Sequence, residues 1–408
     1  MPTHTLMFGW EYPPTHLGGL GVACQGLVNG LLQNGVRVTL VLPHPNQSEQ
    51  DGLDILHPTD SSWHDAMQTM RVRSDLQPYD DLKSFEQRTL KHVPRDIGQM
   101  YGDHLHEAIA TFTDLSVSMT KHVNPNVIHC HDWMTYGAGI RAAVYHRRPF
   151  VAHIHATELD RTHFSPYQWI YDREREGFEA ADHIIAVSNY TKNMLMNQYG
   201  IPGDKISVVH NATADIHDAD AIRLRSEAQP KRAPLVLFLG RLAIQKGGWQ
   251  FLEMAAQVHH LRPDVQFVIA GDGHLMGELI ERSIALGLRD CVMFAGAVNS
   301  NEAKRLYAQA DCFVMPSLSE PFGLVALEAI AQGTPVILSR QSGAAEVVKH
   351  GFAIDFWDTA KMADCVLTIL RDEPLVRQLR TYAPSVLSSL TWKNQAAKVL
   401  SIYHSLLS

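Results

Sequence analysis

The sequence predicts an α/β protein with two doubly wound parallel sheets of the Rossmann-like kind, and three observations support that prediction. The chain has 408 residues, which exceeds the roughly 100 to 200 residues of an ordinary domain. Short apolar runs without alternation recur along it, as in parallel strands that are covered on both faces. Helix-favouring stretches separate these runs, which indicates right-handed crossover connections between the strands.

The first half begins with a strand, a loop rich in glycine and proline, a helix and a second strand. These elements and four later strands are expected at residues 3–8, 20–33 (the helix), 36–42, 126–130, 149–155, 183–188 and 206–210. A charged, helix-favouring stretch from about 60 to 122 interrupts the rhythm and predicts a helical insertion. We therefore expect a first domain over residues 1–214.

The chain turns polar over residues 215–233, which predicts a linker. Strands and helices then alternate strictly in a second domain over 234–385. Its strands are expected at residues 235–240, 265–271, 291–296, 311–317, 334–339 and 352–356. Apolar residues at helical spacing predict a last helix within 386–408.

Composition and charge exclude several classes of protein. The formal net charge of -8 gives no overall positive field for nucleic acid or anionic lipid, so we expect no nucleic-acid partner. No apolar run approaches the roughly 18 residues of a transmembrane segment, and no signal peptide is recognisable. The five cysteines are scattered and odd in number, as free thiols in a reducing compartment would be. These features predict a cytoplasmic protein.

The first candidate site is a glycine cluster between the first strand and the first helix. Gly18, Gly19 and Gly21 lack Cβ atoms, so bare backbone N–H groups at a helix N-terminus can approach a phosphate. The alternative, with about even weight for such a cluster alone, is that these glycines only make a tight turn.

The second candidate site follows the first strand of the second domain. Arg241 and Lys246 stand beside Gly247 and Gly248. Two cations at the end of a parallel strand suit a diphosphate whose negative charge grows as its bond to a sugar breaks. Taken alone, the pair would more simply be two solvated surface cations.

The third candidate site is a pair of carboxylates, Glu320 and Glu328, with seven residues between them. Pro321 and the following Gly323 suggest a compact entry into a helix that begins near Gly323. A spacing of eight positions lets both carboxylates share one helix face. The alternative is that both are ordinary exposed charges.

The motifs together resemble a known family. The R-x4-K and E-x7-E patterns, the EPFGLVALEA string and the TPVI strand resemble the retaining GT-B glycosyltransferases, notably family 4. In the first domain GGLG at 18–21, HDW at 131–133 and HATE at 155–158 look like the glycogen and starch synthases. The resemblance implies a GT-B fold, in which two Rossmann-like domains face each other across a cleft, and a last helix that crosses back to the first domain.

The resemblance also implies roles for the residues of the second domain. Arg241 and Lys246 would bind the donor diphosphate, which Gly19 and its neighbours would approach from the first domain. Glu320 would face the hydroxyls of the transferred glucose, and Glu328 would contact the ribose. The resemblance further implies donor-binding backbone amides at Phe322, Gly323 and Leu324.

In the first domain His155 would hold the 6-hydroxyl or the face of the sugar, while Glu11 and Asp132 would line the acceptor side. His129, His131, His153 and His155 form two H-x-H pairs on expected strands, a pattern that also suggests a metal. A tetrahedral site needs further ligands, and the GT-B relatives need no catalytic metal, so hydrogen-bonded histidines are the favoured interpretation.

The implied activity is retaining transfer of glucose from UDP-glucose or ADP-glucose to a growing α-1,4-glucan, with no cofactor or metal. A front-face reaction without a protein base is favoured over nucleophilic attack by Glu320. The VALEA segment at 325–329 departs from the larger bacterial synthases, so their ADP-glucose preference is not carried over. Two alternatives stay open: another acceptor, such as a lipid, small metabolite or surface glycan, and an inactive carbohydrate-binding homologue.

Overall fold

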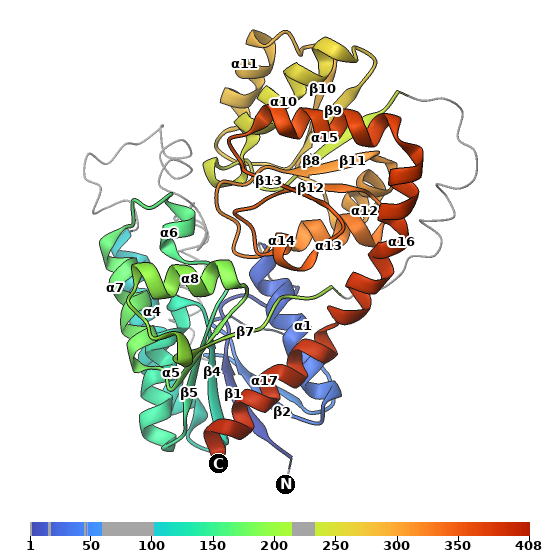
Figure 1. Ribbon diagram of the computed structural model, residues 1–408. Coiled ribbons are helices and arrows are strands. Elements are labelled where there is room, and N and C mark those ends of the chain that lie inside the picture. Colours follow the sequence, from blue (N-terminus) through green and yellow to red (C-terminus); the bar gives the residue numbers. More distant parts are fainter. Residues whose placement is uncertain (1, 15–17, 45, 47, 59–101, 214–232) are drawn as a thin grey trace. The chain divides into compact units, whose positions relative to one another are not determined.

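The computed structural model describes residues 2–14, 18–44, 46, 48–58, 102–213 and 233–408. The chain divides into two compact units, each built on one parallel sheet with helices packed against it (Figure 1). The first unit comprises Met1–Ala212 and Trp392–Ser408, and the second comprises Thr213–Thr391. The prediction of two doubly wound parallel sheets is confirmed.

The sheet of the first unit has seven strands in the order β3-β2-β1-β4-β5-β6-β7. Their bounds are β1 His4–Phe8, β2 Arg37–Val41, β3 Leu53–Leu56, β4 Val127–His131, β5 Phe150–Ile154, β6 His183–Ala186 and β7 Ile206–Val208. The helices of this unit are α1 Gly19–Gln33, α4 Gly102–Thr120, α5 Trp133–His146, α6 Glu158–Arg161, α7 Gln168–Ala180, α8 Asn189–Gln198 and α17 Trp392–Leu407, with a short 3-10 helix η2 at Gly203–Lys205.

Both faces of this sheet are buried. Leu6 and Phe8 of β1 pack into one core with α4, α5 and α7, whereas Met7 between them packs into a second core with α1 and α17. Alternate residues therefore enter opposite cores, and both must be apolar. This arrangement explains why the strand sequences show no apolar and polar alternation.

Two elements of the first unit differ from the expectation. Strand β3 was not predicted, because its four residues at the sheet edge are only partly buried and include Asp54. The stretch expected as an insertion ends in α4, which packs against α5 and leads into β4 as an ordinary crossover helix. Residues 59–101 of that stretch lie outside the described part of the chain.

The sheet of the second unit has six parallel strands in the order β10-β9-β8-β11-β12-β13. Their bounds are β8 Leu235–Leu239, β9 Gln266–Ala270, β10 Val292–Gly296, β11 Cys312–Met315, β12 Val336–Ser339 and β13 Phe352–Ile354. Its helices are η3 Ile244–Lys246 (3-10), α10 Gly248–Leu261, α11 Met276–Ala285, α12 Ser300–Gln309, α13 Leu324–Ala331, α14 Ala344–Val347, α15 Thr359–Arg371 and α16 Glu373–Ser389. Of the linker expected at 215–233, all but residue 233 is outside the described residues.

The C-terminal segment is two helices rather than the single one expected over 386–408. Helix α16 ends at Ser389 within the second unit, and α17 begins at Trp392 and belongs to the first. Helix α17 lies along α1 (Figure 1). In the part of the chain that the structure describes, no helix has the length and apolar character needed to cross a membrane.

Two glycines of α1 allow α17 to come this close. A Cβ atom on Gly26 would lie 2.1 Å from the Trp392 ring, and one on Gly30 would lie 2.3 Å from the Trp392 carbonyl oxygen. Beyond this contact Ala396, Val399 and Tyr403 of α17 are buried in the core beside α1. The absent side chains of α1 therefore form the seat for α17.

Gly30→Ala tests this seat. Alanine normally stabilises a helix relative to glycine, but here the added methyl group meets backbone, so we expect the free energy of unfolding to fall by about 1–3 kcal/mol. Gly277→Ala in α11 is the matched control, because no described atom lies within 4 Å of its Cβ position. Urea denaturation followed by circular dichroism measures both. Equal stability of Gly30→Ala and the native chain would contradict the packing.

Candidate functional site

A lysine and a glutamate meet at the carboxyl edge of the second sheet. The Lys246 Nζ donates a hydrogen bond to the Glu320 Oε2 at 2.5 Å. Lys246 ends η3 in the loop after β8, and Glu320 lies in the loop after β11, the neighbouring strand. The Lys246 side chain is 22% exposed and the Glu320 side chain 9% exposed. The structure thus joins two residues that the sequence placed 74 positions apart, with the cation reachable from solvent.

Gly247 fixes the turn that carries Lys246. Its φ is +77°, and a Cβ atom there would lie 2.0 Å from the Pro316 carbonyl oxygen, so only glycine fits. The Leu318 N–H also donates to the Gln245 carbonyl at 2.8 Å. The loop after β8 is therefore packed directly on the segment that leads to Glu320.

Glu320 is held in a loop rather than in a helix. Its N–H donates to the Gln341 carbonyl at 2.9 Å, its carbonyl accepts from the Gly343 N–H at 3.0 Å, and the Ser317 hydroxyl lies 3.4 Å from its Oε2. Helix α13 begins only at Leu324. The expectation that Glu320 shares a helix face with the second carboxylate is therefore wrong.

The start of α13 is built around Gly323, which has a φ of +99° and precedes the helix as its N-cap residue. A glycine offers no capping side chain, so the first amides of α13 are not capped by it. The backbone carbonyl of the buried Phe322 accepts a hydrogen bond from the Ala344 N–H at 2.6 Å. Glu328 lies one turn into α13, where the Tyr307 hydroxyl donates to its Oε2 at 3.2 Å.

Arg241 follows β8 in the same loop as Lys246. Gly240 before it has a φ of +159° and approaches Gly271 at the end of β9 so closely that a Cβ on Gly271 would lie 1.9 Å from the Gly240 carbonyl oxygen. The Arg241 carbonyl accepts from the Ala243 N–H at 3.0 Å, and the residue is half-buried. Arg241 and Lys246 therefore both lie in the loop at the carboxyl end of β8.

The glycine cluster lies at the start of α1 in the first unit. Gly18 is the N-cap residue with an extended φ of -172°, while Gly19 and the buried Gly21 are in the first turn of the helix. None of the three has the left-handed φ that would require glycine. No described heavy atom lies within 4 Å of a Cβ built on Gly18. Among the described residues, therefore, neither a left-handed φ nor a close neighbour requires glycine at position 18.

The other predicted residues of the first unit follow β1, β4 and β5. Glu11 and Asp132 are buried, and His155 is half-buried. Asp132 has φ 60° and ψ 164°, a conformation that is strained for any residue with a side chain. Its Oδ1 accepts from the His155 N–H at 2.6 Å. The strained aspartate therefore fixes the backbone of His155.

A capping box and a buried ion cluster hold the segment after His155. The Thr157 hydroxyl accepts from the Asp160 N–H at 3.3 Å while the Asp160 carboxylate accepts from the Thr157 N–H at 2.8 Å. The Arg161 guanidinium donates to the Ala156 carbonyl at 3.0 Å. Both ends of this short loop are thereby anchored to α6.

Glu174 of α7 completes the cluster, and sequence reasoning missed it. Its carboxylate accepts from the Glu158 N–H at 2.8 Å, lies 3.4 Å from the Arg161 guanidinium and accepts from the Tyr199 hydroxyl. Burial raises the pKa of Glu174 to about 8, against the opposing effect of Arg161. One signal was present in the sequence: Glu174 occupies a helix position between the buried Ile170 and Phe178.

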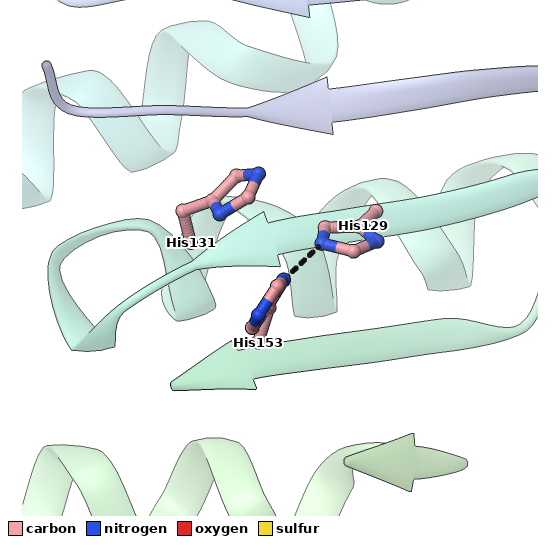
Figure 2. Close-up of side chains that lie close together, drawn as sticks. All are labelled: His129, His131 and His153. Carbon is pink, nitrogen blue, oxygen red and sulfur yellow. Dashed lines mark hydrogen bonds between the residues drawn. The ribbon is translucent and has the colours of Figure 1, made fainter. Parts of the chain in front are cut away.

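Three buried histidines on β4 and β5, His129, His131 and His153, lie near His155. The Tyr403 hydroxyl of α17 lies 2.6 Å from the His129 Nδ1. The His129 Nε2 in turn lies 3.2 Å from the His153 Nδ1, the contact that Figure 2 shows as a dashed line. His131 and His155 form a second pair at 2.9 Å. Burial lowers the pKa of His129 to about 3 and the pKa values of His131 and His153 well below the usual value.

The spacing of these histidines is compatible with hydrogen bonds as well as with metal coordination. One nitrogen from each of His129, His131 and His153 lies within 4.8 Å of the others (Figure 2). Tetrahedral bonds of about 2.0–2.1 Å would bring such nitrogens to about 3.3 Å. A pair at 3.2 Å, as between His129 and His153, is equally suited to a hydrogen bond between neutral imidazoles.

Comparison with family models gives two matches that together span most of the chain. Residues 17–214 match the model described as Glycosyltransferase Family 4, and residues 221–386 match the one described as Glycosyl transferases group 1. The boundary between the two matches falls close to the division into two compact units.

Several curated proteins are similar over much of their length. An uncharacterised glycosyltransferase of Methanocaldococcus jannaschii is 29% identical, with 97% of each chain covered. Glycogen synthase of Mycobacterium tuberculosis is 27% identical over 98% of this chain and 94% of that protein. The D-inositol 3-phosphate glycosyltransferase of Arthrobacter sp. is 31% identical over 69% of this chain and 71% of that protein.

Solved structures agree in fold. Sucrose-phosphate synthase from Thermosynechococcus elongatus superposes with a TM-score of 0.76 at 20% identity and 99% coverage of both chains. The catalytic domain of starch synthase IV from Arabidopsis thaliana, bound to ADP and acarbose, gives a TM-score of 0.69 at 17% identity and full coverage of both chains.

The buried histidines predict acid lability. His129, His131 and His153 stay neutral in the folded chain, but below about pH 6.5 the unfolded chain takes up protons that the folded chain does not. Each buried histidine therefore lowers the free energy of unfolding with decreasing pH by about 1.4 kcal/mol per pH unit, whereas Glu174, whose pKa is raised to about 8, contributes a slope of the same size and opposite sign. Urea titrations at pH 5 to 8 measure this slope.

The variant His153→Asn should reduce the slope of the free energy of unfolding against pH by the contribution of one proton. This reduction is independent of how much the substitution itself destabilises the fold. His163→Asn is the control, because His163 is exposed and has a left-handed φ of +51° that asparagine tolerates. An unchanged slope in His153→Asn would mean that His153 is already protonated in the folded chain.

Proposed function

Because this chain belongs to the GT-B glycosyltransferases, we propose that it transfers glucose, with retained configuration, from UDP-glucose or ADP-glucose to a growing α-1,4-glucan. The observation that supports the donor site most is the Lys246 and Glu320 pair at the carboxyl edge of the second sheet. The similarity to a glycogen synthase over nearly the whole chain supports the glucan acceptor.

Lys246 stabilises the leaving group in this proposal. As the bond between glucose C1 and the phosphate oxygen breaks, negative charge collects on the diphosphate, and the Lys246 ammonium and Arg241 guanidinium offset it. Without ligand, Glu320 holds the ammonium in place at 2.5 Å. A lysine held in position needs little reorganisation during the reaction, and a metal ion is not required for this charge.

The contacts of Glu320 support a front-face reaction. The bond from C1 to phosphate breaks, the acceptor oxygen bonds to C1 on the same face, and the departing phosphate oxygen takes the acceptor proton. The Glu320 Oε2 already accepts from Lys246 and lies 3.4 Å from the Ser317 hydroxyl, which weakens it as a nucleophile. Its second oxygen can then accept from a glucose hydroxyl.

The remaining binding roles follow the resemblance and are proposals. Glu328, held by the Tyr307 hydroxyl, would accept from the ribose. The amides at the start of α13, from Phe322 to Leu324, would donate to the donor diphosphate. In the first unit the N-terminal amides of α1 would do the same, His155 would contact the sugar, and Glu11 and Asp132 the acceptor.

A cytoplasmic location is part of the proposal. All five cysteines are free and buried. Burial raises the pKa of the thiols of Cys24, Cys130 and Cys312, which keeps them protonated and inert. Such thiols suit a reducing compartment, where nucleotide sugars are also available to an enzyme.

Lys246→Ala tests the leaving-group role. We expect turnover to fall by about two to three orders of magnitude, because a transition-state donor is lost. Lys361→Ala, which removes an exposed lysine on α15 of the same unit, should leave turnover unchanged. Initial rates at saturating donor measure turnover, and melting temperatures show whether each variant is folded. Near-native turnover of Lys246→Ala would contradict the diphosphate assignment.

Loss of the cation also leaves Glu320 buried without its partner, so a stability effect must be separated from a catalytic one. Adding Glu320→Gln to Lys246→Ala removes that unpaired charge. We expect the double variant to regain stability but not turnover. Recovery of both would mean that the ion pair is only structural.

Labelled UDP-glucose or ADP-glucose, incubated with glycogen or maltooligosaccharides, tests the acceptor and the stereochemistry. We expect α-linked glucose on the glucan, read by the anomeric proton signals of the product. A β-linked product would contradict retention. Similar proteins named D-inositol 3-phosphate glycosyltransferase and alpha-maltose-1-phosphate synthase favour a second candidate, transfer to a small phosphorylated acceptor.

Inositol 3-phosphate and glucose 1-phosphate therefore belong in the same assay. Transfer to one of these without glucan extension would favour the second candidate. Glucan binding without any turnover of nucleotide sugar would favour an inactive carbohydrate-binding homologue.

A further inference from the structure

His155 touches a buried histidine that itself touches a sulfur atom. The His155 Nε2 lies 2.9 Å from the His131 Nδ1, and the His131 Nε2 lies 3.3 Å from the Met7 Sδ. Both His131 and Met7 are fully buried. These contacts form a short chain from β1 through β4 to the residue after β5.

The sulfur sets the direction of every hydrogen bond in this chain. A thioether carries no hydrogen, so it only accepts, and the His131 Nε2 must be the donor. A neutral imidazole has one N–H, so the His131 Nδ1 is then an acceptor. The His155 Nε2 consequently carries the hydrogen, and its Nδ1 carries a lone pair.

The opposite arrangement is costly at His131. If the His155 Nδ1 carried the hydrogen, the His131 Nδ1 would donate and its Nε2 lone pair would face the Met7 sulfur at 3.3 Å. The His155 Nδ1 is buried and has no hydrogen-bond partner in the described part of the chain. A buried nitrogen without a partner loses its hydration in either tautomer, so the contact between His131 and Met7 decides between the two. The first arrangement leaves the His155 Nδ1 as an acceptor for a ligand hydroxyl.

Neutrality of the rings is a condition of this reasoning, and burial supplies it. Burial lowers the pKa of His131 well below the usual value and lowers that of His155, although Asp132 opposes the shift at His155. The neighbouring pair does not compete for the same nitrogens, because His153 bonds to His129 and only stacks on His155, with ring centroids 4.4 Å apart.

We propose that His131, backed by Met7, is a positioning residue that holds His155 in the Nε2–H tautomer, so that its Nδ1 accepts a hydrogen bond from a sugar hydroxyl. The tautomer itself is a property of the chain without ligand, whereas the hydroxyl contact rests on the proposed function. Asp132 fixes the backbone of His155 at the same time, through the 2.6 Å bond from its N–H. Ring and backbone are thus held by separate partners.

The tautomer is measured on ligand-free protein labelled with 15N-histidine, by long-range 1H–15N correlation, with the His155 signals assigned from their loss in His155→Asn. We expect the Nε2–H pattern in the native chain. His131→Leu should give an average of the two tautomers, while His131→Asn, whose amide oxygen can accept, should restore the native pattern. His183→Leu, which removes a histidine bonded to Ser207 on another strand, should leave His155 unchanged.

An Nδ1–H or doubly protonated pattern in the native chain would overturn the proposal, as would a native pattern in folded His131→Leu. If His131→Leu does not fold, the nearly isosteric Met7→Leu removes the sulfur acceptor and should move His155 towards the averaged pattern. An unmoved His155 in Met7→Leu would also overturn it.

Activity provides the second measurement. With labelled UDP-glucose or ADP-glucose, kcat/KM of His131→Leu should fall about two- to tenfold, the value of one neutral hydrogen bond, and His131→Asn should recover it. Averaged tautomers with unchanged kcat/KM would refute the hydroxyl contact. If the native chain transfers no glucose, the proposed function fails, and the spectra still decide the tautomer.

Discussion

In a parallel sheet every strand ends at the same edge, so the loops that follow the strands are brought together whatever their separation along the chain. This constraint places Lys246 and Glu320 in contact, because β8 and β11 are neighbours in the sheet although two other strands, β9 and β10, and their helices lie between them along the chain. It also places Asp132 beside His155, because β4 pairs with β5. The polar residues that carry the functional proposal all depend on this shared edge.

Several residues in the loops at the strand ends are placed at a cost in local stability. Asp132 adopts a strained backbone conformation, and Gly247 leaves no room for a side chain. Glu174 is a carboxylate buried with Arg161, an arrangement that gains little stability relative to apolar packing. Each of these features fixes the geometry of a loop at the strand ends. Such expense is typical of regions that serve binding or catalysis.

Much of the fold could be predicted from the sequence, because strands buried on both faces have unbroken apolar sequences. Strand β3 could not, since an edge strand with Asp54 in it lacks that signal. The break between α16 and α17 was missed as well, because Leu390 and Thr391 do not differ in composition from the helices on either side. Local sequence reports burial far better than it reports the exact end of an element.

The candidate site shows the same division. The residue types at Arg241 and Lys246 indicated a diphosphate site, whereas the direct contact between Lys246 and Glu320 depends on strand order, which the sequence alone does not reveal. The supports of His155 were hidden for a related reason. Met7 and His131 look like ordinary core positions, and their chemistry emerges only when β1 and β4 lie side by side.

Helix α17 makes the first unit discontinuous along the chain. Residues 392–408 leave the ribosome after the whole second unit, yet they cover the face of α1 that Gly26 and Gly30 leave bare. Until then the nascent first unit exposes an apolar groove, which is a surface for chaperones or for unwanted association. The first unit is thus completed only after the second unit has been synthesised.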